Sequence, residues 1–229
     1  DIELVSRMLE ENGLKINLKK CEFLKAELAF LGCLISKNQL KPMSEKIDAI
    51  NQLEKPNNVK GIRRLIGMIN FYHQCIPKCS EILAPLCDLI KNKQKNDKIV
   101  WNEKANETHR SLKESLKQVT NISMLQEEAP LRLTTDASNV AIGAVLEQAI
   151  EDKQLPVGFH SRKLKVQESR YSTFDRELLA IFDGIRHFRD LIENREFEIY
   201  TDHKSLIHAL GMKNPSPRQQ RQINFISQF

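Results

Sequence analysis

The order of the predicted elements after Pro130 is the feature that most constrains the fold. Apolar and polar positions alternate through residues 131–136, which is the period of a half-buried β-strand. The predicted elements are strands at 131–136, 141–148 and 155–162, a long helix at 173–192, a strand at 197–201, and helices at 204–210 and 218–229. Three successive strands followed by a helix and a further strand indicate an α/β domain.

The chain before Pro130 is predicted to be mainly helical. An amphipathic helix covers residues 1–10, and two short apolar segments, 16–24 and 29–40, read as the strands of a hairpin with turn signals at Gly32 and Asn38. Four further helices are predicted. The first starts near Ser44, the second starts after Asn58, the third spans residues 79–92, and the fourth carries the apolar residues Leu112, Leu116 and Val119. Ser44 and Asn58 are the expected N-caps, since their side chains accept hydrogen bonds from backbone amides.

Composition permits a polyanionic partner without demanding one. The 229 residues carry a formal net charge of +5, and 41% of them are hydrophobic, which supports a real core. No apolar run approaches the length that spans a bilayer, and we expect no membrane partner. The five cysteines are odd in number, so reduced thiols in an intracellular protein are the simplest interpretation.

Two predicted strands end on the same dipeptide, Thr-Asp, which places Asp136 and Asp202 at strand ends. Glu177 lies in the first two turns of the long helix and borders its apolar face. A single acid at either kind of position is usually a solvated end, a cap or a partner of the helix dipole. Three acids together suit Mg²⁺, which prefers hard oxygen ligands. We therefore predict that Asp136, Glu177 and Asp202 share divalent metal.

Two groups of basic residues are candidates for phosphate contact. Lys60, Arg63 and Arg64 gather on one side of a predicted helix at i, i+3 and i+4. The commoner interpretation of three such residues is a solvated basic face, and the more specific one is a face that binds phosphates. Arg162 and Lys163, near the third strand after Pro130, are further candidates, although a plain solvated turn is at least as good an interpretation.

Several segments in order closely resemble the reverse transcriptases of gypsy-class LTR retrotransposons. TTDAS, GAVLEQ, FHSRKL, YSTFDRELLAI and YTDHKSL are similar to that family's ribonuclease H domain. KCEFLKAELAFLGCLISKNQLKP and the segments that follow it are similar to the end of the polymerase palm, then the thumb and connection. The resemblance implies the end of the palm at 1–43, a helical thumb and connection at 44–129, and a ribonuclease H-like domain with a mixed sheet and flanking helices at 130–229.

The resemblance also implies an activity. Asp136, Glu177 and Asp202 fall on three of the family's four catalytic carboxylates, and Lys60, Arg63 and Arg64 fall on a thumb helix that faces template–primer phosphates. The implied reaction is cleavage of RNA in an RNA–DNA hybrid with Mg²⁺ or Mn²⁺, by the two-metal route. The implied setting is a Pol polyprotein inside the cell, in a cytoplasmic virus-like particle or in the nucleus.

Two departures from the family pattern lower the expected activity. The chain has no Asp-Asp pair, so we expect no polymerase centre. The family's fourth carboxylate lies downstream of the region that corresponds to residues 218–229, and no Asp or Glu occurs from His203 to Phe229. A chain truncated at both ends would show weak cleavage or none and would expose its apolar C-terminal residues, Ile223, Phe225, Ile226 and Phe229. One alternative is a non-catalytic nucleic-acid-binding or interaction module. Another is a different metal nuclease or integrase on the same sheet, which the thumb-like first half disfavours.

Overall fold

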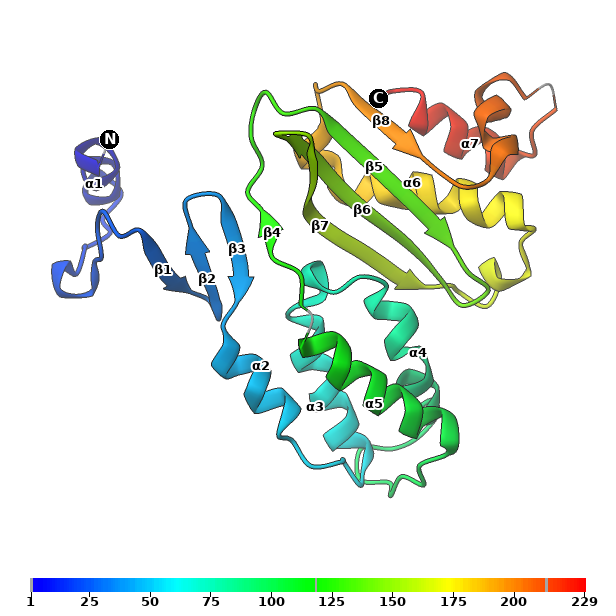
Figure 1. Ribbon diagram of the computed structural model, residues 1–229, viewed down its shortest axis with the longest axis horizontal. Helices are drawn as coiled ribbons and strands as arrows, with labels where there is room; N and C mark the ends of the chain where they lie inside the picture. The colour runs from blue at the N-terminus through cyan, green and yellow to red at the C-terminus, as the bar shows by residue number, and fades with distance from the viewer. Residues whose placement is uncertain (1, 118, 213) are drawn as a thin grey trace.

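Two four-stranded sheets and an intervening group of helices make up the molecule (Figure 1). The computed structural model describes residues 2–117, 119–212 and 214–229. The first sheet has the strand order β1-β2-β3-β4 and the second the order β7-β6-β5-β8. This is the mixed α/β architecture that the sequence predicts. None of the helices in the described ranges is long and apolar enough to cross a membrane.

The first sheet is an antiparallel meander with one late strand added. It follows helix α1 (Ile2–Glu11), and its strands are β1 (Glu27–Phe30), β2 (Cys33–Ser36), β3 (Gln39–Pro42) and β4 (Ile122–Ser123). Leu31 and Gly32, with φ of +47° and +79°, are the two left-handed residues in the turn between β1 and β2, and glycine adopts this conformation without strain. The strand predicted at 16–24 is wrong. That segment contains a 3-10 helix, Leu18–Lys20, because the Asn17 side chain accepts a hydrogen bond from the Lys19 amide and caps it.

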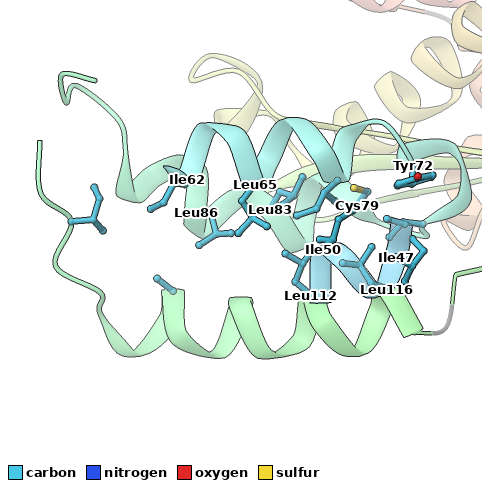
Figure 2. Close-up of a cluster of buried hydrophobic side chains, with 14 of the residues drawn as sticks. Ile47, Ile50, Ile62, Leu65, Tyr72, Cys79, Leu83, Leu86, Leu112 and Leu116 are labelled. Atoms are coloured by element: carbon cyan, nitrogen blue, oxygen red, sulfur yellow. The ribbon is translucent and has the colours of Figure 1, made fainter. Parts of the chain in front are cut away.

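Four helices form the region between the sheets, and they share one hydrophobic core. They are α2 (Ser44–Asn51), α3 (Val59–Asn70), α4 (Cys79–Leu89) and α5 (Glu103–Lys117). The buried side chains labelled in Figure 2 are Ile47, Ile50, Ile62, Leu65, Tyr72, Cys79, Leu83, Leu86, Leu112 and Leu116. Asn58 is the N-cap of α3, as predicted, because its Oδ1 accepts from the Gly61 amide at 2.8 Å. The prediction for Ser44 is wrong: Met43 occupies the N-cap position of α2.

The second sheet lies against a long helix. Its elements are β5 (Leu131–Ala137), β6 (Ala141–Ile150), β7 (Lys153–Lys163), α6 (Thr173–Ile192), β8 (Phe197–Tyr200), a 3-10 helix η4 (Lys204–Gly211) and α7 (Pro217–Ile226). β6 pairs antiparallel with β5 and β7, whereas β8 pairs parallel with β5. The predicted strands and the long helix are confirmed, while the helix predicted at 204–210 is a 3-10 helix.

The apolar C-terminal residues are packed rather than exposed, which overturns the expectation from the sequence. Ile223 is 6% exposed within the core under α6. The Phe225 ring meets Phe182 of α6 edge-on, with ring centroids 5.0 Å apart. The amphipathic helix α7 begins with a capping box formed by Ser216 and Gln219. Its apolar face packs against α6.

Candidate functional site

Asp136 lies near the end of β5, and Asp202 follows the end of the neighbouring strand β8 by two residues. β5 and β8 are parallel, with Leu131 opposite Phe197 and Thr134 opposite Tyr200. β8 ends at Tyr200, and Asp202 lies in the bend that follows it, beyond the paired residues. Neighbouring strands are about 4.8 Å apart, so the parallel pairing brings the two carboxylates to one end of the sheet. The shared metal site of these two acids stays a prediction.

Glu177 approaches the same place from the long helix. Ser172 caps α6 by accepting a hydrogen bond from the Asp175 amide, so Glu177 comes early in the helix. The helix axis lies close to the sheet at Gly184, where a Cβ in place of the glycine hydrogen would meet the Cβ of Ala144 at 3.0 Å. α6 packs against β5 and β6, and Glu177 is buried, with 3% of its surface exposed.

The Glu177 carboxylate is in an unusual electrostatic environment. Its Oε2 is buried without a hydrogen-bond partner. Burial, followed by the charges of Asp202 and Asp136, raises the pKa of Glu177 to about 7, although the Ala137 amide and Arg176 partly offset this rise. Buried polar atoms are almost always hydrogen-bonded, so an orphaned carboxylate oxygen beside two acids suits a cation that supplies the missing charge.

The carboxylate oxygens of these three acids suit a hard divalent cation, but the three side chains are not arranged as a complete metal site. In the ranges that the structure describes, no three Asp, Glu, His or Cys side chains converge as a ready-made metal site. One contact distinguishes Asp136 from the other two acids. Its Oδ2 lies 2.5 Å from Nζ of Lys78, which comes from the helical region 58 residues earlier in the chain.

The Lys78 contact was not predictable from the sequence. Lys78 precedes α4 and has a left-handed backbone, with φ of +52°. The hydrogen bond to Asp136 is the main cause that raises the pKa of Lys78, and burial lowers it in part, while the charges of Asp136, Glu81 and Asp202 add to the rise. The ammonium is therefore within electrostatic range of two of the three candidate metal ligands.

Lys78 is held in place by a hydrogen-bonded seam between the helical region and β7. The Ser80 amide donates to Ser161 Oγ at 2.9 Å, and Ser80 Oγ donates to the Ser161 carbonyl at 2.8 Å. His73 Nε2 lies 3.3 Å from Ser80 Oγ and 3.2 Å from Ser161 Oγ. The seam fixes the start of α4 against the edge strand of the second sheet.

The two predicted groups of basic residues differ in how exposed they are. Lys60, Arg63 and Arg64 are exposed on α3, as a phosphate-contacting face requires. Arg162 is instead largely buried. Its guanidinium contacts Glu168 at 2.7 Å and Asp183 at 3.0 Å, so these carboxylates occupy the donors that a phosphate would need.

Lys163 is also engaged within the protein. Its Nζ lies 2.6 Å from Oδ1 of Asp88, on α4, which adds a second ion pair across the seam. Both side chains thus bind carboxylates of this chain, and their role as nucleic-acid contacts stays a prediction. Sequence reasoning missed these partners, since they lie 6 to 75 residues away along the chain.

Asp183 is the structurally important acid that the sequence did not single out. It is 2% exposed, and its carboxylate contacts His160 at 2.9 Å, Arg162 at 3.0 Å and Arg186 at 3.1 Å. Burial alone would raise the pKa of Asp183, but the hydrogen bond with His160 and the charge of Arg162 lower it overall. The sequence position of Asp183, on the side of α6 that is buried, could have indicated this burial.

The chain is similar in sequence to a reverse transcriptase domain family and to retrotransposon polyproteins. Residues 126–229 match the family described as the RNase H-like domain found in reverse transcriptase. The Tf2-3 and Tf2-4 transposon polyproteins of Schizosaccharomyces pombe are each 35% identical to the chain over 206 residues, covering 89% of this chain and 15% of the relative. The chain thus spans about 15% of the length of these curated relatives.

Solved structures share the fold. The foamy viral protease-reverse transcriptase in complex with RNA/DNA hybrid matches with a TM-score of 0.76 and 23% identity, over 98% of this chain and 31% of that one. The dRH form of the same kind of protein in complex with double-stranded DNA matches with a TM-score of 0.77 and 22% identity, over 100% and 40%. At these identities the likeness concerns the fold.

Proposed function

Because this chain belongs to the reverse transcriptases of LTR retrotransposons and residues 126–229 are their RNase H-like domain, we propose that Asp136, Glu177 and Asp202 bind divalent metal for hydrolysis of RNA in an RNA–DNA hybrid. The observation that carries the proposal is the orphaned Oε2 of buried Glu177 beside Asp136 and Asp202. Three acids at one end of a sheet are costly unless a cation neutralises them.

Each carboxylate has a distinct structural role in this proposal. Asp136 offers its oxygens from β5, Asp202 from the bend after β8, and Glu177 from the helix that covers the sheet. Bound Mg²⁺ or Mn²⁺ would activate a water and stabilise the leaving oxygen. Burial of Glu177 excludes bulk water from one side of the site, so the electrostatic attraction there is screened less than at the open surface.

Substrate contact is assigned to the helical region. Lys60, Arg63 and Arg64 form one exposed basic face on α3, and we assign to it the backbone phosphates of an RNA–DNA hybrid or template–primer duplex. Phosphate contacts of this kind set affinity and register without reading base sequence. The foamy viral relative whose complex contains an RNA/DNA hybrid supports a hybrid as the first substrate to test.

The wider setting is proposed on the same basis. We assign residues 1–43 to the end of the palm, 44–129 to the thumb and connection, and 130–229 to the ribonuclease H-like domain of a gypsy-class element. The partners would be nucleic acid and the rest of the Pol polyprotein, inside the cell, in a virus-like particle or the nucleus. The 229 residues contain no adjacent pair of aspartates, so hydrolysis rather than DNA synthesis is the proposed activity.

The direct test is cleavage of a labelled RNA–DNA hybrid by the 229-residue chain with Mg²⁺ or Mn²⁺, beside Asp136→Asn and a double-stranded RNA substrate. Hybrid-specific cutting that disappears in Asp136→Asn supports the proposal. Hybrid binding without cutting under either metal contradicts catalysis by these three acids and favours a non-catalytic nucleic-acid-binding module. Cutting that persists in Asp136→Asn contradicts the assigned site.

A further inference from the structure

The backbone around Lys78 fixes where its side chain can reach. The Lys78 carbonyl accepts hydrogen bonds from the amides of Glu81 at 3.0 Å and Ile82 at 3.1 Å, which starts α4. Its side chain makes no capping hydrogen bond to the helix. A left-handed backbone is disfavoured for a residue with a Cβ, so the lysine is not at this position for local backbone reasons. Its ammonium is free to extend towards the second sheet.

The position of α4 makes the contact with Asp136 a fixed feature. Two residues after Lys78, Ser80 exchanges two hydrogen bonds with Ser161 of β7. Further along the helix, Asp88 pairs with Lys163 at 2.6 Å. These anchors lie on either side of the same helix–strand contact. They hold the start of α4 beside the end of the sheet that carries Asp136.

The surroundings of the pair offer a second partner for the ammonium. Lys78, Glu81 and Asp136 line one small cavity, together with Gly143, which lies opposite Asp136 on β6. Glycine adds no side chain there, so the space beside the Asp136 carboxylate stays open. Glu81, in the first turn of α4, lines the same cavity, and its charge acts on the Lys78 ammonium. The ammonium can therefore leave Asp136 without becoming an isolated charge.

We infer that Lys78 and a divalent cation bind Asp136 as alternatives, so that this lysine of the helical region weakens metal binding at the nuclease-like site. The inference rests on the proposed function. While Lys78 donates to Oδ2 of Asp136, that oxygen is occupied, and the positive charge repels an incoming cation.

The test is the affinity of the 229-residue chain for Mn²⁺, measured by isothermal titration and by electron paramagnetic resonance of free Mn²⁺. Lys78→Gln is expected to bind Mn²⁺ roughly three- to tenfold more tightly, since a half-exposed ion pair and one repulsive charge are removed. Lys163→Gln is the matched control, because it removes the same charge from the other ion pair of the seam. Its affinity should stay within about twofold of the parent chain.

Two further variants separate the outcomes. Lys78→Arg keeps the charge and should keep the weak affinity, and Asp136→Asn should abolish binding. If Asp136→Asn abolishes binding but Lys78→Gln equals the parent chain, the inference about Lys78 is overturned and the proposed metal site stands. If Asp136→Asn binds like the parent chain, the proposed site itself fails. Lys78 has a side chain that is 60% exposed, and circular dichroism will verify that each variant is folded.

Discussion

Ser80 and Ser161 exchange two hydrogen bonds across the boundary between the helical region and the second sheet, although 81 residues separate them. One is donated by a backbone amide and the other is accepted by a backbone carbonyl. Ser161 is 5% exposed, so these bonds are shielded from competing water. The pair is the most direct link between the region that carries the basic face and the sheet that carries the candidate metal ligands.

Ser161→Ala is expected to destabilise the protein by about 1–2 kcal/mol, because the Ser80 amide and His73 both lose a partner. Chemical denaturation measures the loss, and amide hydrogen exchange should rise at the start of α4. Ser169→Ala is the control, since that exposed hydroxyl contacts only the nearby Val166 carbonyl. It should change the free energy of unfolding by less than about 0.5 kcal/mol. Equal effects of the two changes would contradict a structural role for the seam.

Glu177→Gln is expected to stabilise the metal-free protein at pH 8, by about 1–3 kcal/mol. The pKa of Glu177 is about 7 in the folded chain, above its ordinary value of about 4.3. The folded state therefore holds this proton more tightly, and stability is lost as pH rises through 7. Below about pH 4.3 the carboxyl is protonated in both states, and the variant should match the parent chain.

The measurement is thermal unfolding in EDTA from pH 4 to pH 8, with Asp190→Asn on the exposed side of the same helix as control. That variant should show little of the pH-dependent gain. With saturating Mn²⁺ the order at pH 8 should reverse, because only the parent chain gains stability from metal binding. If the Glu177→Gln protein is less stable than the parent chain in EDTA at pH 8, burial of the charged Glu177 carboxylate beside two acids does not destabilise the folded protein.

Asp183→Asn is expected to destabilise the protein by about 2–4 kcal/mol at pH 7, since it leaves His160 and Arg162 with a neutral partner in a buried site. The pKa of Asp183 is lowered on folding. Its contribution is therefore present above the ordinary aspartate pKa of about 3.9 and is lost as pH falls through the lowered value. The difference between variant and parent should shrink in urea titrations as the pH is lowered towards 3.

Arg186→Ala serves as the control for that network. Arg186 contacts the same carboxylate at 3.1 Å, but its side chain is 62% exposed. Exposed ion pairs contribute little, so we expect a loss below about 1 kcal/mol. A loss as large as that of Asp183→Asn would show that burial is not what makes this carboxylate important.

Replacing Lys60, Arg63 and Arg64 by glutamine is expected to weaken binding of an RNA–DNA hybrid by roughly tenfold or more at about 0.1 M salt, if each contacts phosphate. The slope of log affinity against log salt should fall by about 2–3. Fluorescence anisotropy across a salt series gives both quantities. Neither sequence nor length of the hybrid duplex should alter the size of the loss, because phosphate contacts carry no base information.

A charge-matched triple on α5 tests whether position or net charge matters. Lys104, Arg110 and Lys117 are exposed on that helix, and their replacement by glutamine also removes three positive charges. Hybrid affinity and the salt slope should change much less in this variant. Equal losses in the two triples would mean that general charge, and not the α3 face, attracts the nucleic acid.

Local patterns in the sequence predicted most of the second sheet. The strands starting at Leu131 and Ala141 and the helix Thr173–Ile192 carry periods of about 2 and 3.6 residues that belong to each segment alone. The Asn58 cap is local in the same sense. The segment 16–24 failed because the Asn17 side chain competes for nearby backbone amides, a contact that an apolar pattern does not register.

The sequence by itself determined most of the elements and the position of Asp136 near the end of β5, since periodicity and turn residues act over a few neighbours. Only the tertiary structure decided which charges meet. It buried Asp183, gave Arg162 and Lys163 carboxylate partners, and brought Lys78 to Asp136. Ion pairs of this kind join residues that are distant in the chain, and their partners depend on how α4, α6 and β7 pack. No periodicity along the sequence records that packing.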